Sequence, residues 1–300
     1  MRIFQCTFFI SLLCLSFVSA EQSFKSGIYA HRAKIQWKDG NYSAAASLYN
    51  NALNEALREA NLPSENKIRL NRAHLELDAM RVKETKRWIS SLSPNHKSLD
   101  VYFHKLLLEL QMAIQTGDCK EKVSELSGFM KKHKANESLN LKVARIPMSI
   151  CFAQSGQFKK ASNQIKWTEE EFEGKAQGQR AYAQAWIELH LHNWTRAIKN
   201  LHTAFDFAQK AMRPYELGQI LFHLGNCYEK LDEKNLAKQF YYRSFTVFNK
   251  IQILNPMARS LNKYLEYEAD DQLENDLKII SSNLSEAEKN MIHIKPTYFK

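Results

Sequence analysis

Apolar and small residues follow helical spacing over most of the chain. In the stretch DGNYSAAASLYNNAL, residues 39–53, Ala45, Tyr49 and Ala52 are separated by four and then three residues, which places them on one stripe of a helix. Gly40 comes two residues before Tyr42, where a tight turn between two helices would favour it. The stretch therefore predicts the turn and the second helix of a helical hairpin.

The same turn, aromatic and alanine pattern recurs along the chain. It returns clearly in SGQFKKASNQIKWT, HNWTRAIKNLHTA and LGNCYEKLDEKNLAKQFYYRSF, and more weakly in LNRAHLELDAMRVKETKRWISSL and IQTGDCKEKVSELSGF. One hairpin cannot bury its own apolar face, so a series of copies predicts a stack with a shared core. One equivalent position per copy gives intervals of 40, 37, 39, 36 and 40 residues, through Ala45, Thr85, Lys122, Ala161, Ala197 and Ala237.

These copies resemble the tetratricopeptide repeat (TPR), and the resemblance covers about residues 26–250. It implies an all-α protein, a right-handed α-solenoid of about six to seven TPR-like hairpins. A total of only six valines also favours helices over strands. Pro147 falls inside an expected first helix, which should start late or kink there. The matching residues are Leu221, Leu224, Gly225, Tyr228, Ala237 and Tyr241 in one copy, and Ala33, Gly40, Tyr42, Ala45, Tyr49 and Ala52 in another.

The pattern divides the chain into four parts. Residues 1–20, MRIFQCTFFISLLCLSFVSA, combine Arg2, an apolar run and a Val18-Ser19-Ala20 cleavage pattern, which predicts a signal peptide. Residues 21–254 are the predicted repeat array, and Asn255-Pro256 is the predicted break after it. Residues 255–284 are a degenerate final repeat or capping helices, and residues 285–300 are a C-terminal tail. The predicted location is outside the cytoplasm, in the periplasm or the extracellular space.

Cysteine usage and charge add little that is specific. Cys119, Cys151 and Cys227 remain after removal of the signal peptide, and an odd number cannot pair completely. We expect them to be small buried hydrophobic residues, with a Cys119–Cys151 bridge as the alternative.

The net charge after signal removal is +9, which favours anionic surfaces such as a membrane or an acidic polysaccharide. An ordinary solvated surface is the competing interpretation, and export makes nucleic acid an unexpected partner.

Motifs for catalysis and for metal or cofactor binding are absent from the sequence. It contains no HExxH, GxSxG, phosphate-binding loop, paired CxxC or EF-hand pattern. His190 and His192 lie two residues apart and would point away from each other on a helix, so they cannot share a metal ion. The sequence therefore predicts a protein that is not an enzyme and that has no metal site and no cofactor.

The resemblance implies a binding groove lined by the first helix of each hairpin. In the TPR family such a groove usually holds a protein or peptide segment, so an exported scaffold or adaptor is the predicted function. The alternative is an envelope protein that binds or processes glycans, with Trp37, Tyr182 and Trp186 as stacking platforms. The expected partner-binding residues are Lys34, Trp37, Lys38, Tyr182, Trp186, His190, Phe222, Asn226 and Lys230.

Overall fold

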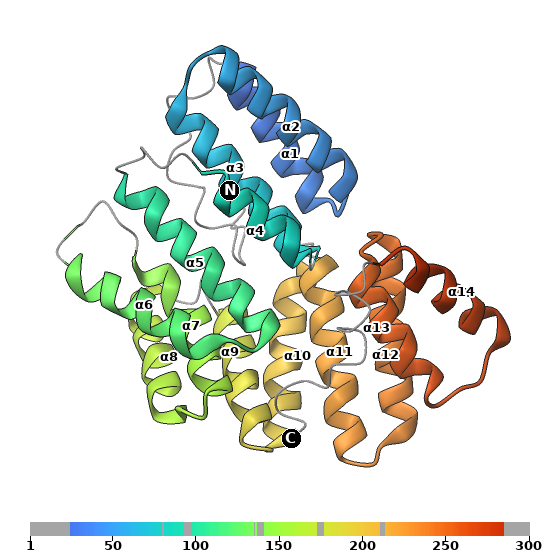
Figure 1. Cartoon of the computed structure of the whole chain (residues 1–300). Coiled ribbons are helices and arrows are strands. Elements are labelled where there is room, and N and C mark those ends of the chain that lie inside the picture. The colour runs from blue at the N-terminus through green and yellow to red at the C-terminus, as the bar shows by residue number, and fades with distance from the viewer. Residues whose placement is uncertain are drawn as a thin grey trace, which may run out of the picture. The chain divides into compact units, whose positions relative to one another are not determined.

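The structure of the protein is a computed structural model that describes residues 25–79, 81–92, 98–134, 136, 141–172, 177–210 and 214–284, with the backbone alone over 167–172. The predicted signal peptide and C-terminal tail lie outside these residues. The described chain is helical and contains no strand. It forms two compact units, residues 1–175 and residues 176–300. We refer to them as unit 1 and unit 2 and describe each by itself (Figure 1).

Each unit is built from antiparallel helix pairs, which confirms the all-α fold of stacked hairpins. In unit 1, α1 packs on α2, α3 on α4, α5 on α6 and α7 on α8. In unit 2, α9 packs on α10, α11 on α12 and α13 on α14. The helices of unit 1 are α1 (Lys25–Lys38), α2 (Tyr42–Arg58), α3 (Leu62–Asp78), α4 (Val82–Ser90), α5 (Leu99–Thr116), α6 (Cys119–Lys132), α7 (Arg145–Gln154) and α8 (Phe158–Phe172). Those of unit 2 are α9 (Gln177–His190), α10 (Trp194–Lys210), α11 (Pro214–Lys230), α12 (Lys234–Lys250), α13 (Leu254–Leu265) and α14 (Asp271–Ser282).

The repeated small position has the same place in every second helix. It is the fourth residue of α2, α4, α6, α8, α10 and α12. Five of the six side chains there, Ala45, Thr85, Ala161, Ala197 and Ala237, are fully buried. The sixth, Lys122 of α6, is half-buried and forms an ion pair with Glu109 of α5 at 3.2 Å. A small side chain lets the two helices of a hairpin approach closely, and in α6 a lysine paired with the partner helix takes its place.

A glycine of the first helix allows a similarly close contact in the hairpin α11/α12. A Cβ atom on Gly225 of α11 would lie 2.7 Å from the ring of Tyr241 on α12, which real structures do not tolerate. Glycine at this position therefore allows the tyrosine ring to lie directly on the backbone of α11. This is the physical basis of the Leu-Gly and tyrosine pairing that the sequence shows at this hairpin.

Prolines mark helix starts in both units. Pro147 lies in the first turn of α7, which begins at Arg145 after a short 3₁₀ turn, Leu141–Ala144, so this helix starts late as expected. Pro256 lies in the first turn of α13, where a missing N–H costs nothing. The interruption between α12 and α13 accordingly covers residues 251–253 and precedes the proline.

A disulfide joins the third and fourth hairpins of unit 1. Cys119, the first residue of α6, is bonded to Cys151 in the middle of α7, and both side chains are buried. The expectation that all three cysteines are unpaired was therefore wrong, because the stacking of α6 on α7 brings these two Cα atoms to 5.1 Å. Cys227 in unit 2 is free and buried, as predicted, and burial raises the pKa of its thiol to about 12.

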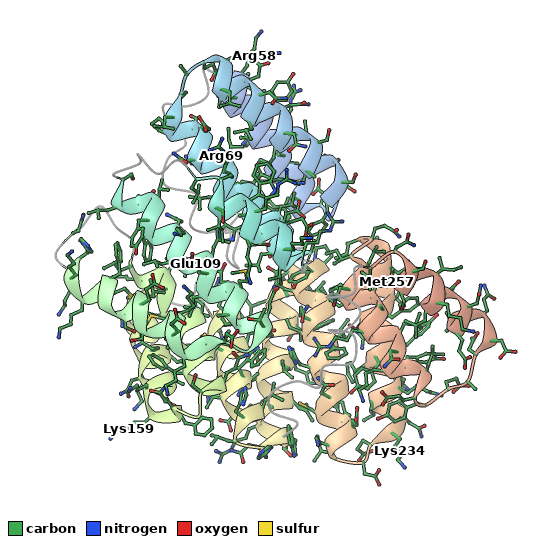
Figure 2. The ribbon with its side chains drawn as sticks, viewed as in Figure 1. Arg58, Arg69, Glu109, Lys159, Lys234 and Met257 are labelled. Carbon is green, nitrogen blue, oxygen red and sulfur yellow. A yellow bond between two sulfur atoms is a disulfide. The ribbon has the colours of Figure 1, made fainter. Side chains whose placement is uncertain are left out.

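Side chains at the edges of unit 1 extend into solvent, as Figure 2 shows for Arg58 and Lys159.

The last pair of unit 2 closes the array differently from the other pairs. α14 packs Leu277 and Ile280 against Leu254 and Ala258 of α13. None of the residues of α14 is fully buried, and its remaining face is mostly polar, which suits a helix that ends a stack in water.

Candidate functional site

The first helices carry a row of polar residues at equivalent positions, which we call the end row. Each member lies seven residues before the small position of the following helix and in the last turn of its own helix. The end row thus contains two lysines, one aspartate, two glutamines and one histidine. Its members are Lys38, Asp78, Gln115 and Gln154 in unit 1, and His190 and Lys230 in unit 2.

In unit 1 the end row joins successive hairpins by hydrogen bonds. The Trp37 indole N–H of α1 donates to Asp78 Oδ2 of α3 at 2.9 Å. The Gln115 amide of α5 donates to the Leu77 carbonyl at 2.9 Å, and the Gln154 amide of α7 donates to the Ile114 carbonyl at 3.1 Å. Each bond reaches from one repeat to the next, so these polar side chains hold the stack together. Asp78, Gln115 and Gln154 were not among the predicted residues, although the repeat interval alone identifies their positions.

The predicted residues Lys34, Trp37 and Lys38 lie together on α1. Trp37 is half-buried and packs against the first core cluster, with its ring 6.4 Å from that of His74 on α3. His74 is buried, and desolvation lowers the pKa of its imidazole to about 3, so the ring is neutral. Lys34 is half-buried and Lys38 is exposed. This part of unit 1 therefore presents two lysines beside a tryptophan whose indole N–H is already used.

In unit 2 the predicted aromatic residues form a ladder along α9. Tyr182, Trp186 and His190 are spaced by four residues, with ring centroids 6.4 Å and 5.8 Å apart. Trp186 is only 9 % exposed and also meets the ring of His223 on α11 at 5.1 Å. Desolvation lowers the pKa of His190 to about 4 and that of His223 to about 3. The ladder is therefore an uncharged aromatic surface between α9 and α11.

Besides Trp186, two further predicted binding residues are enclosed by the fold. Asn226 has no exposed surface and its Oδ1 lies 2.7 Å from the Tyr241 hydroxyl, while Phe222 is 3 % exposed and packs beneath the Arg259 guanidinium at 4.5 Å. Their positions on α11 face α12 and α13 more than solvent, so both stabilise the stack and do not present a contact surface. Lys230 at the end of α11 is exposed.

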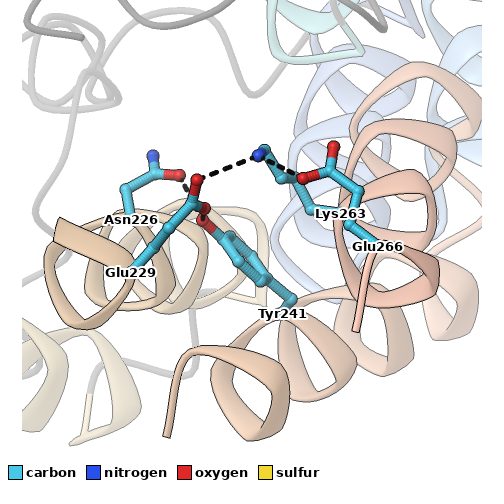
Figure 3. Close-up of polar contacts among 5 residues, drawn as sticks. All are labelled: Asn226, Glu229, Tyr241, Lys263 and Glu266. Carbon is cyan, nitrogen blue, oxygen red and sulfur yellow. Dashed lines mark hydrogen bonds and ion pairs between the residues drawn. The ribbon is translucent and has the colours of Figure 1, made fainter. Parts of the chain in front are cut away.

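A network of polar and charged side chains connects α11, α12 and α13 in unit 2 (Figure 3). The Tyr241 hydroxyl of α12 donates to the Glu229 carboxylate of α11 at 2.5 Å. The Lys263 ammonium of α13 donates to Glu229 at 3.2 Å and to Glu266 at 2.7 Å. Burial and the Glu229 carboxylate raise the pKa of the nearby Tyr267. The network joins three consecutive helices.

Sequence reasoning missed Lys263 and Arg259. Both lie on α13, which the sequence analysis treated as part of a degenerate repeat without groove positions. A signal was available, since Arg259 and Lys263 follow Asn226 and Lys230 by the same interval of 33 residues. A repeat with an interval close to that of the TPR therefore continues into α13, and its residues equivalent to Asn226 and Lys230 are basic.

The described residues hold no cluster of three or more His, Cys, Asp or Glu side chains that could bind a metal ion. Among them, no helix is long and apolar enough to cross a membrane. The glycan alternative finds no support in the ladder, because a sugar stacks on an exposed ring face and Trp186 is almost wholly covered. Glycoside hydrolysis uses a pair of carboxylates. The Trp37 indole N–H meets one carboxylate, that of Asp78.

Comparison with known proteins gives limited matches. No protein-family model matches the chain. The chain is 36 % identical over 52 residues to response regulator aspartate phosphatase A of Bacillus subtilis (strain 168); the match spans 17 % of this chain and 14 % of that protein's length. A crystal structure of a tetratricopeptide repeat protein from Parabacteroides merdae ATCC 43184 aligns with a TM-score of 0.44 and 10 % identity, over 86 % of this chain and 99 % of that chain.

Proposed function

We propose that the protein is an exported, non-enzymatic scaffold or adaptor that binds a protein or peptide segment on the surface of its first helices. The observation that carries the proposal is the set of lysines and aromatic rings at neighbouring positions of the first helices, among which Lys38 and Lys230 are exposed. Two lysines, Lys34 and Lys38, lie beside the Trp37 ring, and the neutral imidazole of His190 lies beside the Trp186 ring. Aromatic anchors with adjacent charges suit a polypeptide that carries apolar side chains and carboxylates.

Stacked hairpins support this type of function for a physical reason. Each repeat presents the same first-helix positions at a regular spacing, so an extended segment can contact several repeats in succession. Residues that line such a surface have rigid supports, because the end-row hydrogen bonds of Gln115 and Gln154 fix one first helix against the next. The binding positions are therefore preorganised, which reduces the entropy lost on binding.

Export is supported by the disulfide between Cys119 and Cys151, together with the predicted signal peptide. Disulfides persist in oxidising compartments and are rare in the cytosol. Thiol labelling of the denatured protein, taken directly from cell fractions, tests this part of the proposal. One cysteine, Cys227, should react before reduction and three after it. Three reactive thiols before reduction, or a chain that keeps residues 1–20, would contradict export.

Binding is tested by capture followed by a purified assay. The protein and a Lys34→Ala, Lys38→Ala, Lys230→Ala variant are immobilised and exposed to the secreted and envelope fraction of the source organism. The matched control removes three exposed lysines from second helices by Lys83→Ala, Lys86→Ala and Lys131→Ala. Trp186 is left intact because it is buried.

The expected result is a discrete protein retained by the wild type and by the control and lost from the first variant. Its binding is then repeated with purified components, with a synthetic peptide from the partner as competitor. Equal retention by the two variants would show that the first helices do not form the binding surface.

A further inference from the structure

The second helices α10 and α12 of unit 2 form an outer face that the proposed function does not use. Their buried positions, such as Leu201 and Phe248, face the first helices, and the opposite sides of both helices are exposed. The two helices lie side by side. The Arg243 guanidinium of α12 lies over the rings of Phe205 and Phe240 at 5.6 and 5.3 Å, and His202 of α10 meets Phe240 at 6.2 Å.

This face is strongly basic. α10 and α12 together contain seven basic residues and one acidic residue, Asp206. Lys238 and Lys234 pair with acidic residues outside these helices, Glu268 at 2.6 Å and Asp232 at 3.7 Å. Within the part of the chain that the structure describes, the other five cations form no ion pair. They are Arg196, Lys199, Lys210, Arg243 and Lys250, and all are exposed.

Aromatic rings lie among these cations. The described residues include three exposed Phe, Tyr or Trp side chains, Tyr102, Phe207 and Tyr242, and the last two belong to this face. Phe207 is 37 % exposed and lies 6.0 Å from the Lys210 ammonium, and Tyr242 is 45 % exposed. By contrast, the outer sides of α4 and α6 in unit 1 carry Glu84, Glu121 and Glu125 among their lysines and no exposed aromatic ring.

We propose that the outer face of α10 and α12 binds the surface of an anionic phospholipid bilayer. Exposed cations that form no ion pair attract lipid phosphates, and amphipathic rings such as those of Tyr242 and Phe207 insert at the level of the headgroups. A bilayer fits the face better than a protein segment because the cations spread over two neighbouring helices and both exposed rings stand among them. The first helices of unit 2 remain available for the partner described above.

The direct test is co-sedimentation of the purified protein with vesicles of phosphatidylglycerol and phosphatidylcholine in equal parts, and with vesicles of phosphatidylcholine alone. We expect binding to the mixed vesicles only, weakening as sodium chloride is added, because salt screens the attraction. A Lys199→Gln, Lys210→Gln, Lys250→Gln variant should bind about 100-fold more weakly, since each basic side chain near a membrane surface contributes about fivefold.

The matched control removes the same charge from unit 1 by Lys83→Gln, Lys86→Gln and Lys131→Gln, and it should retain most of the wild-type affinity. The circular dichroism of both variants should equal that of the wild type, since none of the six lysines forms an ion pair in the described structure. Equal weakening of the two variants would reduce the effect to net charge and overturn the assignment to α10 and α12. Absence of wild-type binding to the mixed vesicles would overturn the proposal outright.

A Tyr242→Gln variant distinguishes a bilayer from a soluble polyanion. Loss of the exposed ring should weaken vesicle binding several-fold and leave binding to dextran sulfate unchanged, because only a bilayer has an apolar layer for the ring to enter. Unchanged vesicle affinity in this variant, with dextran sulfate bound as tightly as the vesicles, would assign the face to acidic polysaccharides and contradict the proposal.

Discussion

At the scale of single residues, five of the described turns inside hairpins use one backbone conformation, whatever the side chain. The residue five positions before the small position has a positive φ angle at Gly40, Gly117 and Gly156, and also at His192 and Asp232. The left-handed conformation costs a residue with a Cβ atom about 1–2 kcal/mol. Glycine in three turns is therefore a local adaptation, and the other two turns tolerate the cost because the packed helices on both sides determine the path of the chain.

The turn between α2 and α3 offers a direct test of this cost. Ala60 is exposed and has a φ angle of 49°. Ala60→Gly should raise the free energy of unfolding of unit 1 by about 0.5–1 kcal/mol, because the strain relieved exceeds the added flexibility of the unfolded chain. Urea denaturation followed by circular dichroism measures it. The control Ala44→Gly, at an exposed helical position of α2, should lower stability by a similar amount, and a loss in both variants would refute the strain.

Buried histidines are a second feature at this scale. His223 faces His190 and Arg259, and its neighbours include the rings of Tyr182, Trp186 and Phe222. Its folded pKa of about 3 lies below the unfolded value of about 6.5, so the unfolded chain binds the proton first. Its contribution to stability is complete above about pH 6.5 and is lost progressively as the pH falls towards 3.

We therefore expect the stability of unit 2 to fall with pH below about 6.5, with about 1.4 kcal/mol per pH unit from each such histidine. His223→Phe should reduce the slope of unfolding free energy against pH by about 1.4 kcal/mol per pH unit, because one fewer proton binds on unfolding. Urea denaturation at a series of pH values measures this slope. An unchanged slope in His223→Phe would mean that this ring is already protonated in the folded protein.

At the scale of elements, the first helix of the hairpin α3/α4 carries a buried ion pair of its own. Glu76 is 2 % exposed and pairs with Arg72 at 2.5 Å and with Arg81 at 3.3 Å. Arg72 also lies over the ring of Trp88 on α4 at 5.7 Å. Removing one partner of a buried ion pair leaves an uncompensated charge, whereas replacing both by apolar residues removes the desolvation cost as well.

Glu76→Gln should therefore destabilise unit 1 by about 3–5 kcal/mol, because the Arg72 guanidinium would remain buried without its carboxylate. The double variant Arg72→Met, Glu76→Leu should be much closer to wild-type stability. Equilibrium denaturation of both proteins provides the comparison. A single variant as stable as the wild type would show that this pair is hydrated and contributes little.

At the scale of the whole molecule, the chain consists of two units with different internal reinforcement. Unit 1 contains the Cys119–Cys151 disulfide and end-row hydrogen bonds to backbone carbonyls, whereas unit 2 contains the Glu229 and Lys263 network and a free buried cysteine. In unit 1 the disulfide stands next to Lys122, where the small side chain of the other hairpins is replaced.

Reduction should consequently affect one unit and spare the other. The disulfide encloses a sequence separation of 32 residues, for which the loss of loop-closure entropy predicts about 3–4 kcal/mol of stabilisation. Dithiothreitol, or a Cys119→Ala, Cys151→Ala variant, should lower the melting temperature of the unit 1 transition in calorimetry. A Cys227→Ser variant serves as the control for thiol chemistry in unit 2. Equal shifts of both transitions would contradict the assignment of the link to unit 1.

The sequence by itself determined where the helices lie and which residues share one face of each helix. The interval from Ala45 to Ala237 placed the start of every second helix, because a hairpin buries its small residues only if turn, aromatic and alanine keep a constant spacing. These features are local, so a few neighbouring residues are enough to specify them. The assignment of Lys34, Trp37, Lys38, Tyr182, Trp186 and His190 to a groove comes from the resemblance to the TPR and stays a prediction.

Only the tertiary structure decided how those positions are used. Phe222 and Asn226 share the phase of Tyr182 and Trp186, but Arg259 and Tyr241 from other helices cover them. The bond between Cys119 and Cys151 likewise depends on how α6 stacks on α7. Burial, pairing and pKa depend on neighbours that are distant in sequence, and a repeat pattern specifies which face of a helix a residue occupies without specifying what the next repeat places against it.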